Sequence, residues 1–114
     1  MHPMFDSLSR EEKLLLLQLV CSLAWADMEI RESERRFIER LVDKLELDAE
    51  ACAEARAWLQ VAPSPHALDT GKIPKEHRRA FIATARALIY VDGDVDADER
   101  AQLDWLQEQL GVSS

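Results

Sequence analysis

The sequence is poor in the residues that shape tight turns and strands. It has three glycines and four prolines among 114 residues, and β-branched residues are sparse. With so few glycines, no glycine-rich phosphate-binding loop is present. Alanine, leucine, glutamate and arginine dominate instead, and these are good helix formers. Composition therefore favours an all-helical fold, and the length suits one domain spanning residues 1–114.

The sequence also lacks the usual patterns of catalytic and thiolate–metal sites. Cys21 and Cys52 show neither a Cys-x-x-Cys pair nor any other metal-ligand spacing. His2, His66 and His77 fall in different segments without paired spacing, and no Ser/His/Asp arrangement is legible. We therefore expect a protein that is not an enzyme and that has no catalytic or organic-cofactor residues.

Long apolar runs are absent as well. The longest extends from Leu14 to Ala26 and contains Gln18 and Ser22, whereas a membrane span needs about 20 apolar residues. The first residues lack the basic region of a signal peptide. We expect no membrane insertion, a cytoplasmic location and reduced thiols, with Cys21 buried in the core.

The excess of acidic residues limits the partners of the protein. The formal net charge is −8, which repels phosphate backbones and acidic membrane surfaces. We therefore expect no nucleic-acid binding. A protein partner and metal ions remain plausible, and the sequence leaves the oligomeric state open.

Apolar residues recur at helical spacing in five segments. Ser9 and Glu12 form a capping box before the first segment, Asp48 is a good cap for the third, and Gly111 is a typical left-handed end for the fifth. The predicted helices span about residues 10–26, 32–45, 49–60, 74–91 and 97–110, with Pro74 at the first helical position of the fourth. The first is apolar nearly all round, so it should lie centrally with the fourth.

The chain contains an internal repeat with an offset of 65 residues (92 − 27 = 65). The shared pattern is aromatic-x-Asp-x-acid-aliphatic-x-x-x-Glu-Arg, followed by apolar residues at helical spacing. The matched pairs are Leu23/Leu88, Trp25/Tyr90, Asp27/Asp92, Glu29/Asp94, Ile30/Val95, Glu34/Glu99, Arg35/Arg100, Ile38/Leu103, Leu41/Leu106, Leu45/Leu110 and Leu47/Val112.

This repeat predicts the architecture. Each unit is a helix, an acidic loop and a second helix, and each hairpin alone leaves an apolar face uncovered, so the two should pack together. We expect an all-α, single-domain helical bundle of two pseudo-symmetric repeats, one at about residues 10–47 and the other at about 74–112.

The acidic loops are candidate sites for a divalent cation, because hard cations prefer carboxylate oxygens. The candidate ligands are Asp27, Glu29 and Glu34 in the first repeat and Asp92, Asp94, Asp96 and Glu99 in the second. The ion would be Ca²⁺, Mg²⁺, Mn²⁺ or Zn²⁺. The second loop is not an EF-hand, because Ala97 and Leu103 occupy the positions that require glycine and glutamate.

A structural interpretation competes with the cation site. Asp96 and Glu99 have capping-box spacing, and Glu34 occupies the same third helical position in the first repeat. Acids at a helix start also interact favourably with the helix dipole, whose positive end disfavours a bare cation. A capping carboxylate retains a second oxygen, so the two interpretations are compatible.

Two further features stand outside the repeat pattern. The basic cluster Lys75, His77, Arg78 and Arg79 opens the fourth helix and is expected to meet the acidic loops or solvent. Trp105 lies toward the outer side of the fifth helix, and an exposed tryptophan there would suggest a partner surface.

The segment from Tyr90 to Arg100, together with Leu110-Gly111-Val112, resembles the TerB or TerB-like tellurite-resistance domain, and the segment from Ala26 through Glu34 resembles the first half of that family. The resemblance covers roughly residues 12–112. It implies a helical, internally repeated protein of a stress response, including tellurite stress, that binds metal through its acidic residues. A related domain forms the front part of a membrane-anchored J-domain co-chaperone. The alternative function is therefore a protein–protein interaction module or co-chaperone-like adaptor with structural acidic loops.

Overall fold

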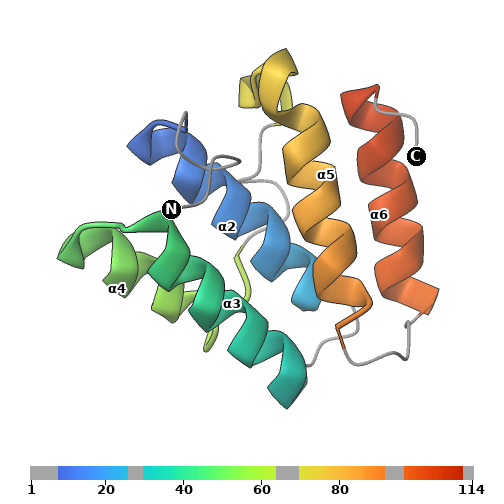
Figure 1. Ribbon diagram of the computed structural model, residues 1–114. Coiled ribbons are helices and arrows are strands. Elements are labelled where there is room, and N and C mark those ends of the chain that lie inside the picture. Colours follow the sequence, from blue (N-terminus) through green and yellow to red (C-terminus); the bar gives the residue numbers. More distant parts are fainter. Residues whose placement is uncertain (1–7, 26–29, 64–69, 92–96, 112–114) are drawn as a thin grey trace.

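The computed structural model describes residues 8–25, 30–63, 70–91 and 97–111 (Figure 1). Within these ranges the chain is helical and has no strand, which confirms the all-α prediction. The elements are α2 (Arg10–Ala24), α3 (Glu32–Leu45), α4 (Ala49–Ala57), the 3₁₀ turn η2 (Thr70–Lys72), α5 (Lys75–Ile89) and α6 (Ala97–Leu110).

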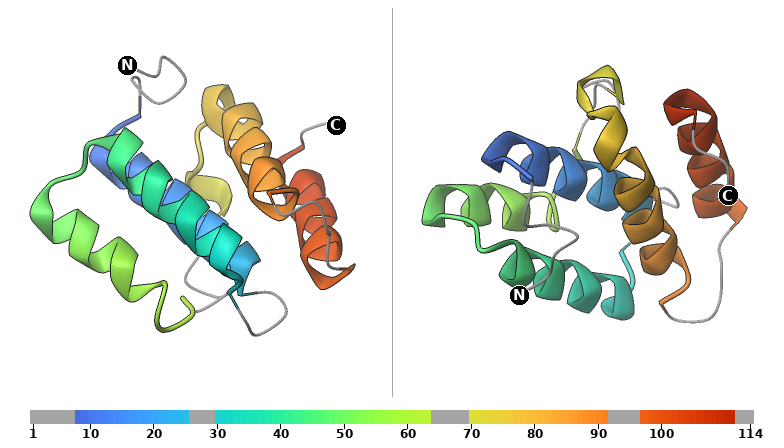
Figure 2. Two further views of the ribbon diagram at one scale, coloured as in Figure 1. Left: turned by 60° about the horizontal axis from the view of Figure 1, so that its bottom comes forward. Right: turned by 45° about the horizontal axis from the view of Figure 1, so that its top comes forward.

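Helix α2 lies at the centre of the bundle. It packs against α3, α4, α5 and α6, and Figures 1 and 2 show α3 and α4 on one side of it and α5 and α6 on the other. Its side chains are buried on almost every face, as a central helix requires. The buried residues of α2 are Leu16, Leu17, Leu19, Val20, Cys21, Ser22, Leu23 and Ala24.

The predicted caps at the starts of α2 and α4 are confirmed. The hydroxyl of Ser9 accepts a hydrogen bond from the Glu12 amide, and the Glu12 carboxylate accepts one from the Ser9 amide. The Asp48 carboxylate accepts from the Ala51 amide at 2.8 Å. The same carboxylate pairs with Arg10 at 2.7 Å, so the starts of α2 and α4 are joined.

Four predicted helix bounds differ from the structure, and one of them is the end of α5, which lies at Ile89 rather than near residue 91. Helix α2 ends at Ala24, with Trp25 as its C-cap, and α4 ends at Ala57, where 3₁₀-type bonds from Leu59 and Gln60 continue the chain. Pro74 is the N-cap of α5 rather than its first helical residue, because its ψ of 143° is extended. Short terminal turns of this kind are common where helices leave the α geometry.

The two halves of the chain have matching patterns of burial. Leu23 and Leu88 are both fully buried. The pairs Ile38/Leu103, Leu41/Leu106 and Leu45/Leu110 are at most 4% exposed. Helix α2 packs against α3 and α5 packs against α6, as two hairpins would. The pseudo-twofold relation between the hairpins stays a prediction.

Candidate functional site

Two of the seven proposed metal ligands lie in the described part of the chain. These are Glu34, the third residue of α3, and Glu99, the third residue of α6. Asp27, Glu29, Asp92, Asp94 and Asp96 lie outside the described residues. The helix ends that flank the two acidic loops lie within the described part of the chain.

Glu34 is a buried carboxylate at the start of α3, with 2% of its surface exposed. Its Oε1 accepts a hydrogen bond from the backbone amide of Arg31 at 3.1 Å. This is the reciprocal half of a capping box, made without its usual partner, since an arginine side chain has no acceptor. The capping interpretation is confirmed for this residue, and this hydrogen bond engages its Oε1.

Glu99 occupies the equivalent position in α6 and is 1% exposed. Asp98 precedes it in the same helical turn. The positive end of a helix dipole stabilises acids in this turn. Removing a carboxylate from water is nevertheless costly unless hydrogen bonds or a cation compensate. The chain therefore buries an acid at the same point in both repeats. An acid at the protein surface would not incur this desolvation cost.

The helix ends that precede the two loops adopt the same backbone conformation. Trp25 caps α2 with φ −89° and ψ 3°, and Tyr90 caps α5 with φ −99° and ψ 3°. The backbone of each repeat therefore leaves its helix in the same direction at the aromatic residue. Their side chains differ, because the indole of Trp25 is partly buried whereas Tyr90 is 45% exposed.

The first loop is anchored on both flanks to the end of α4. The indole Nε1 of Trp25 donates to the Trp58 carbonyl at 2.7 Å. From the other flank, Nη2 of Arg35 donates to the Leu59 carbonyl at 3.4 Å. Both anchors hold the helix ends between which Asp27 and Glu29 fall in the sequence.

Glu34 and Glu99 carry carboxylate oxygens, the type of ligand that hard cations prefer. Carboxylates suit Ca²⁺, Mg²⁺ and Mn²⁺, whereas Zn²⁺ prefers nitrogen and sulfur ligands in addition. No group of three His, Cys, Asp or Glu side chains within the described ranges is placed to hold a metal ion. Any such group in the loops requires the acids that precede Glu34 and Glu99 in the sequence.

One residue of the basic cluster at the start of α5 has a different role from the one expected. Nε of Arg78 donates to the Ile73 carbonyl at 3.0 Å, and its Nη1 donates to the Leu110 carbonyl at 3.3 Å. Arg78 therefore ties the start of α5 to the carboxyl end of α6, where carbonyls lack helical partners. For Arg78 the expectation of contact with an acidic loop or solvent is wrong, whereas Lys75 and Arg79 are exposed to solvent as expected.

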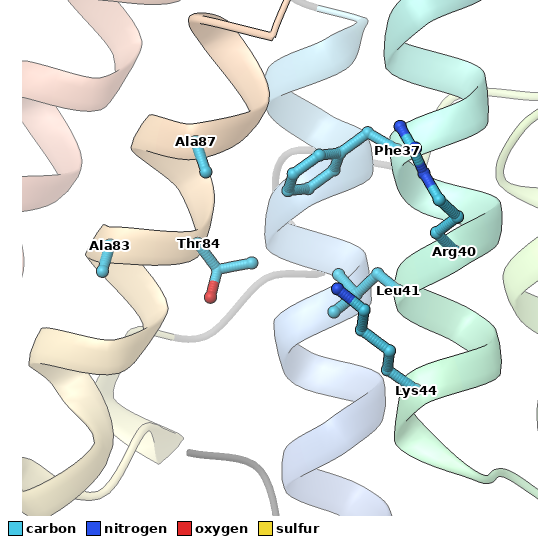
Figure 3. A pocket seen from close by; sticks show the side chains of 7 residues that line it. All are labelled: Phe37, Arg40, Leu41, Lys44, Ala83, Thr84 and Ala87. Carbon is cyan, nitrogen blue, oxygen red and sulfur yellow. The ribbon is translucent and has the colours of Figure 1, made fainter. Parts of the chain in front are cut away.

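A groove between α3 and α5 is a feature that the sequence analysis missed (Figure 3). It has a volume of about 450 Å³ and is mainly apolar. One signal was present in the sequence, namely two cations at i,i+4 spacing beside an aromatic residue on α3. The lining residues are Phe37, Arg40, Leu41 and Lys44 from α3 and Ala83, Thr84 and Ala87 from α5.

The exposed aromatic expected on α6 is confirmed. Trp105 is 52% exposed and lies beside Asp98, Ala101 and Gln102 at a shallow, open surface depression. Among the described helices, none is both long and apolar enough to cross a membrane.

Comparison with known proteins finds a family model that matches part of the chain. The model of the family described as tellurite resistance protein TerB matches residues 2–57. This segment contains the first acidic loop, with Asp27, Glu29 and Glu34, and ends within α4. No curated protein and no solved structure matches the chain.

Proposed function

This chain is TerB-like, and from that premise we propose that it is a non-enzymatic, cytoplasmic stress-response protein of the tellurite-resistance type. It binds a divalent cation through its acidic inter-helix loops. The ligands are Asp27, Glu29 and Glu34 in one loop and Asp92, Asp94, Asp96 and Glu99 in the other. Each set combines acids of the loop with the buried glutamate of the helix that follows it.

The burial of Glu34 and Glu99 is the observation that carries this proposal. Both side chains are at most 2% exposed. A capping bond by itself does not require burial, because exposed acids cap helices equally well, as Glu12 does from a more accessible position in α2. A cation shared with the loop acids would offset the desolvation of the glutamate charge.

Metal titration tests the proposal directly. Ca²⁺, Mg²⁺, Mn²⁺ and Zn²⁺ are added separately to chelator-treated protein while tryptophan fluorescence and Tm are followed. Binding to the folded state stabilises it by about 2.7 kcal/mol at a hundredfold excess over Kd. For a domain of this size that corresponds to a rise in Tm of roughly 10 °C.

Paired variants show whether the loops are responsible. Asp27→Asn with Glu34→Gln and Asp92→Asn with Glu99→Gln should each reduce the metal-dependent rise in Tm. Glu39→Gln with Glu108→Gln is the matched control, because these two exposed acids lie outside the loops and lose the same charge. The cation proposal fails if no metal shifts Tm at millimolar concentration, or if the loop variants respond as the control does.

A protein–protein interaction module is the second candidate function. The groove between α3 and α5 favours it, because an open apolar groove of about 450 Å³ is a common feature of binding surfaces. In that case the acidic loops serve as helix caps alone, and partner binding persists in chelator.

A further inference from the structure

The groove between α3 and α5 combines a buried floor with small residues on one wall. Leu41 is 4% exposed and Thr84 is 6% exposed, so both belong to the edge of the core. Ala83 and Ala87 form the α5 wall and are solvent-exposed, and Figure 3 shows the Phe37 side chain directed toward them from α3. A second surface can therefore approach the α5 backbone closely on one side and contact an aromatic ring on the other.

The rim of the groove is positively charged, although the protein as a whole is acidic. Arg40 and Lys44 are exposed and stand one helical turn apart on α3. Neither forms an ion pair with any residue that the structure describes, whereas Arg36 on the preceding turn pairs with Glu32 at 3.3 Å. Like charges at i,i+4 spacing oppose helix formation slightly. The protein has a net charge of −8, yet Arg40 and Lys44 place two positive charges, without ion-pair partners among the described residues, beside an apolar groove.

The dimensions of the groove fit a helix. From Phe37 to Lys44 the α3 wall extends about 10 Å, or two helical turns. Recognition of an amphipathic helix in a groove uses apolar anchors at i, i+3, i+4 and i+7, which span the same length. Acids one turn apart on such a helix would match the spacing of Arg40 and Lys44. Alanine walls also allow the short interaxial distances of packed helices.

We infer that this groove binds an acidic amphipathic helix of a partner protein. The apolar face of the helix lies over Leu41 and Thr84, between Phe37 and the two alanines, and its acids pair with Arg40 and Lys44. The inference stands apart from the cation site, because neither Glu34 nor Glu99, the two proposed metal ligands that the structure describes, lines the groove. Loss of metal binding leaves it intact, and its own failure leaves the metal site intact.

A designed peptide provides the probe. It is a fluorescein-labelled amphipathic helix with leucine at i, i+3, i+4 and i+7 and glutamate at the remaining positions. A control peptide carries lysine in place of each glutamate. We expect saturable binding of the acidic peptide to the full chain by fluorescence polarisation in chelator, weakening as salt is added, and much weaker binding of the lysine peptide.

Two pairs of protein variants locate the binding. Arg40→Glu with Lys44→Glu should weaken binding about tenfold or more, because two attractions become repulsions. Arg56→Glu with Arg100→Glu changes the net charge equally on helices that do not line the groove and should leave binding unchanged. Ala83→Gln fills the groove and should also weaken binding, whereas Ala101→Gln, at an exposed site on α6, should not. Circular dichroism confirms that each variant is folded.

Several results would overturn the inference. One is the absence of acidic-peptide binding to folded protein, and another is equal binding of the two peptides. A third is unchanged affinity in the Arg40/Lys44 variant. If sedimentation instead shows self-association that the same variant abolishes, without peptide binding, the occupant is a second copy of this chain. If dodecanoate binds in the groove and the peptide does not, the occupant is a lipid-like anion.

Discussion

The indole nitrogen of Trp25 donates a hydrogen bond to the backbone carbonyl of Trp58 at 2.7 Å. These residues are the C-caps of α2 and α4, so one bond joins two helix ends that are 33 positions apart. Arg35 reaches the adjacent Leu59 carbonyl from the start of α3. The end of α4 therefore acts as a brace across both flanks of the first acidic loop.

Removing this brace should destabilise the fold moderately. Trp25→Phe retains an aromatic ring but leaves the partly buried Trp58 carbonyl without its indole donor. A lost hydrogen bond of this kind costs about 1 kcal/mol, which corresponds to a fall in Tm of roughly 4 °C. Urea unfolding measures the change. Trp105→Phe is the control, because its side chain is 52% exposed, and the brace has no energetic role if both variants unfold at the same urea concentration.

Conservative and truncating changes at Glu34 should separate its two proposed roles. Glu34→Gln retains an oxygen that can accept from the Arg31 amide, so its stability in chelator should stay within about 0.5 kcal/mol of the parent protein. Glu34→Ala removes the acceptor and should cost about 1 kcal/mol. Both should lose the metal response. If glutamine is as damaging as alanine in chelator, the negative charge rather than the hydrogen bond stabilises the start of α3.

The fold could be predicted because its main determinants are local in the sequence. Apolar spacing identified the five α-helices that the structure describes, and short capping patterns located the starts of α2 and α4. The left-handed glycine end at Gly111 also occurs as predicted, with φ of 68°. The helix ends at Ala24 and Ala57 were harder to predict from the sequence, because terminal turns depend on tertiary hydrogen bonds such as the one between Trp25 and Trp58.

The sites were harder to predict because they depend on tertiary placement. Glu34 and Glu99 were identified from the repeat, yet their near-complete burial is a tertiary property that the repeat alone did not reveal. The groove combines residues from α3 and α5, which lie far apart in the sequence. The sequence indicated that Arg78 contacts solvent or an acidic loop, because no residue near it in the sequence points to the Leu110 carbonyl.

Arg78 should prove to be a structural residue of the bundle. Arg78→Met keeps the length of the side chain and removes both donors, to the Ile73 and Leu110 carbonyls. Hydrogen bonds to charged groups contribute about 1.5–3 kcal/mol, and partial exposure lowers that figure, so we expect a loss of about 1–2 kcal/mol. Arg79→Met, at the exposed neighbouring position, should cost less than about 0.5 kcal/mol. Equal melting temperatures for the two variants would contradict this role.

Cys21 should make the stability of the protein sensitive to alkaline pH. The side chain is fully buried, and burial raises the pKa of its thiol from 9.0 to about 12. Above pH 9 the unfolded chain therefore ionises this group first, and deprotonation favours unfolding. The contribution is complete below pH 9 and is lost as the pH rises toward 12. Near pH 10.5 the loss should be roughly 2 kcal/mol.

Cys21→Ala isolates this effect, because it removes only this thiol and leaves every other titratable residue in place. The variant should be less stable near neutral pH, owing to the smaller side chain in the core. Its stability should fall less steeply between pH 9 and about pH 10.5, as measured by urea unfolding at each pH. The same burial predicts that 5,5′-dithiobis(2-nitrobenzoate) modifies Cys52, which is partly exposed, before Cys21 in the native protein. Parallel pH profiles for the two proteins, or equally fast modification of both thiols, would show that Cys21 is accessible to solvent through local opening.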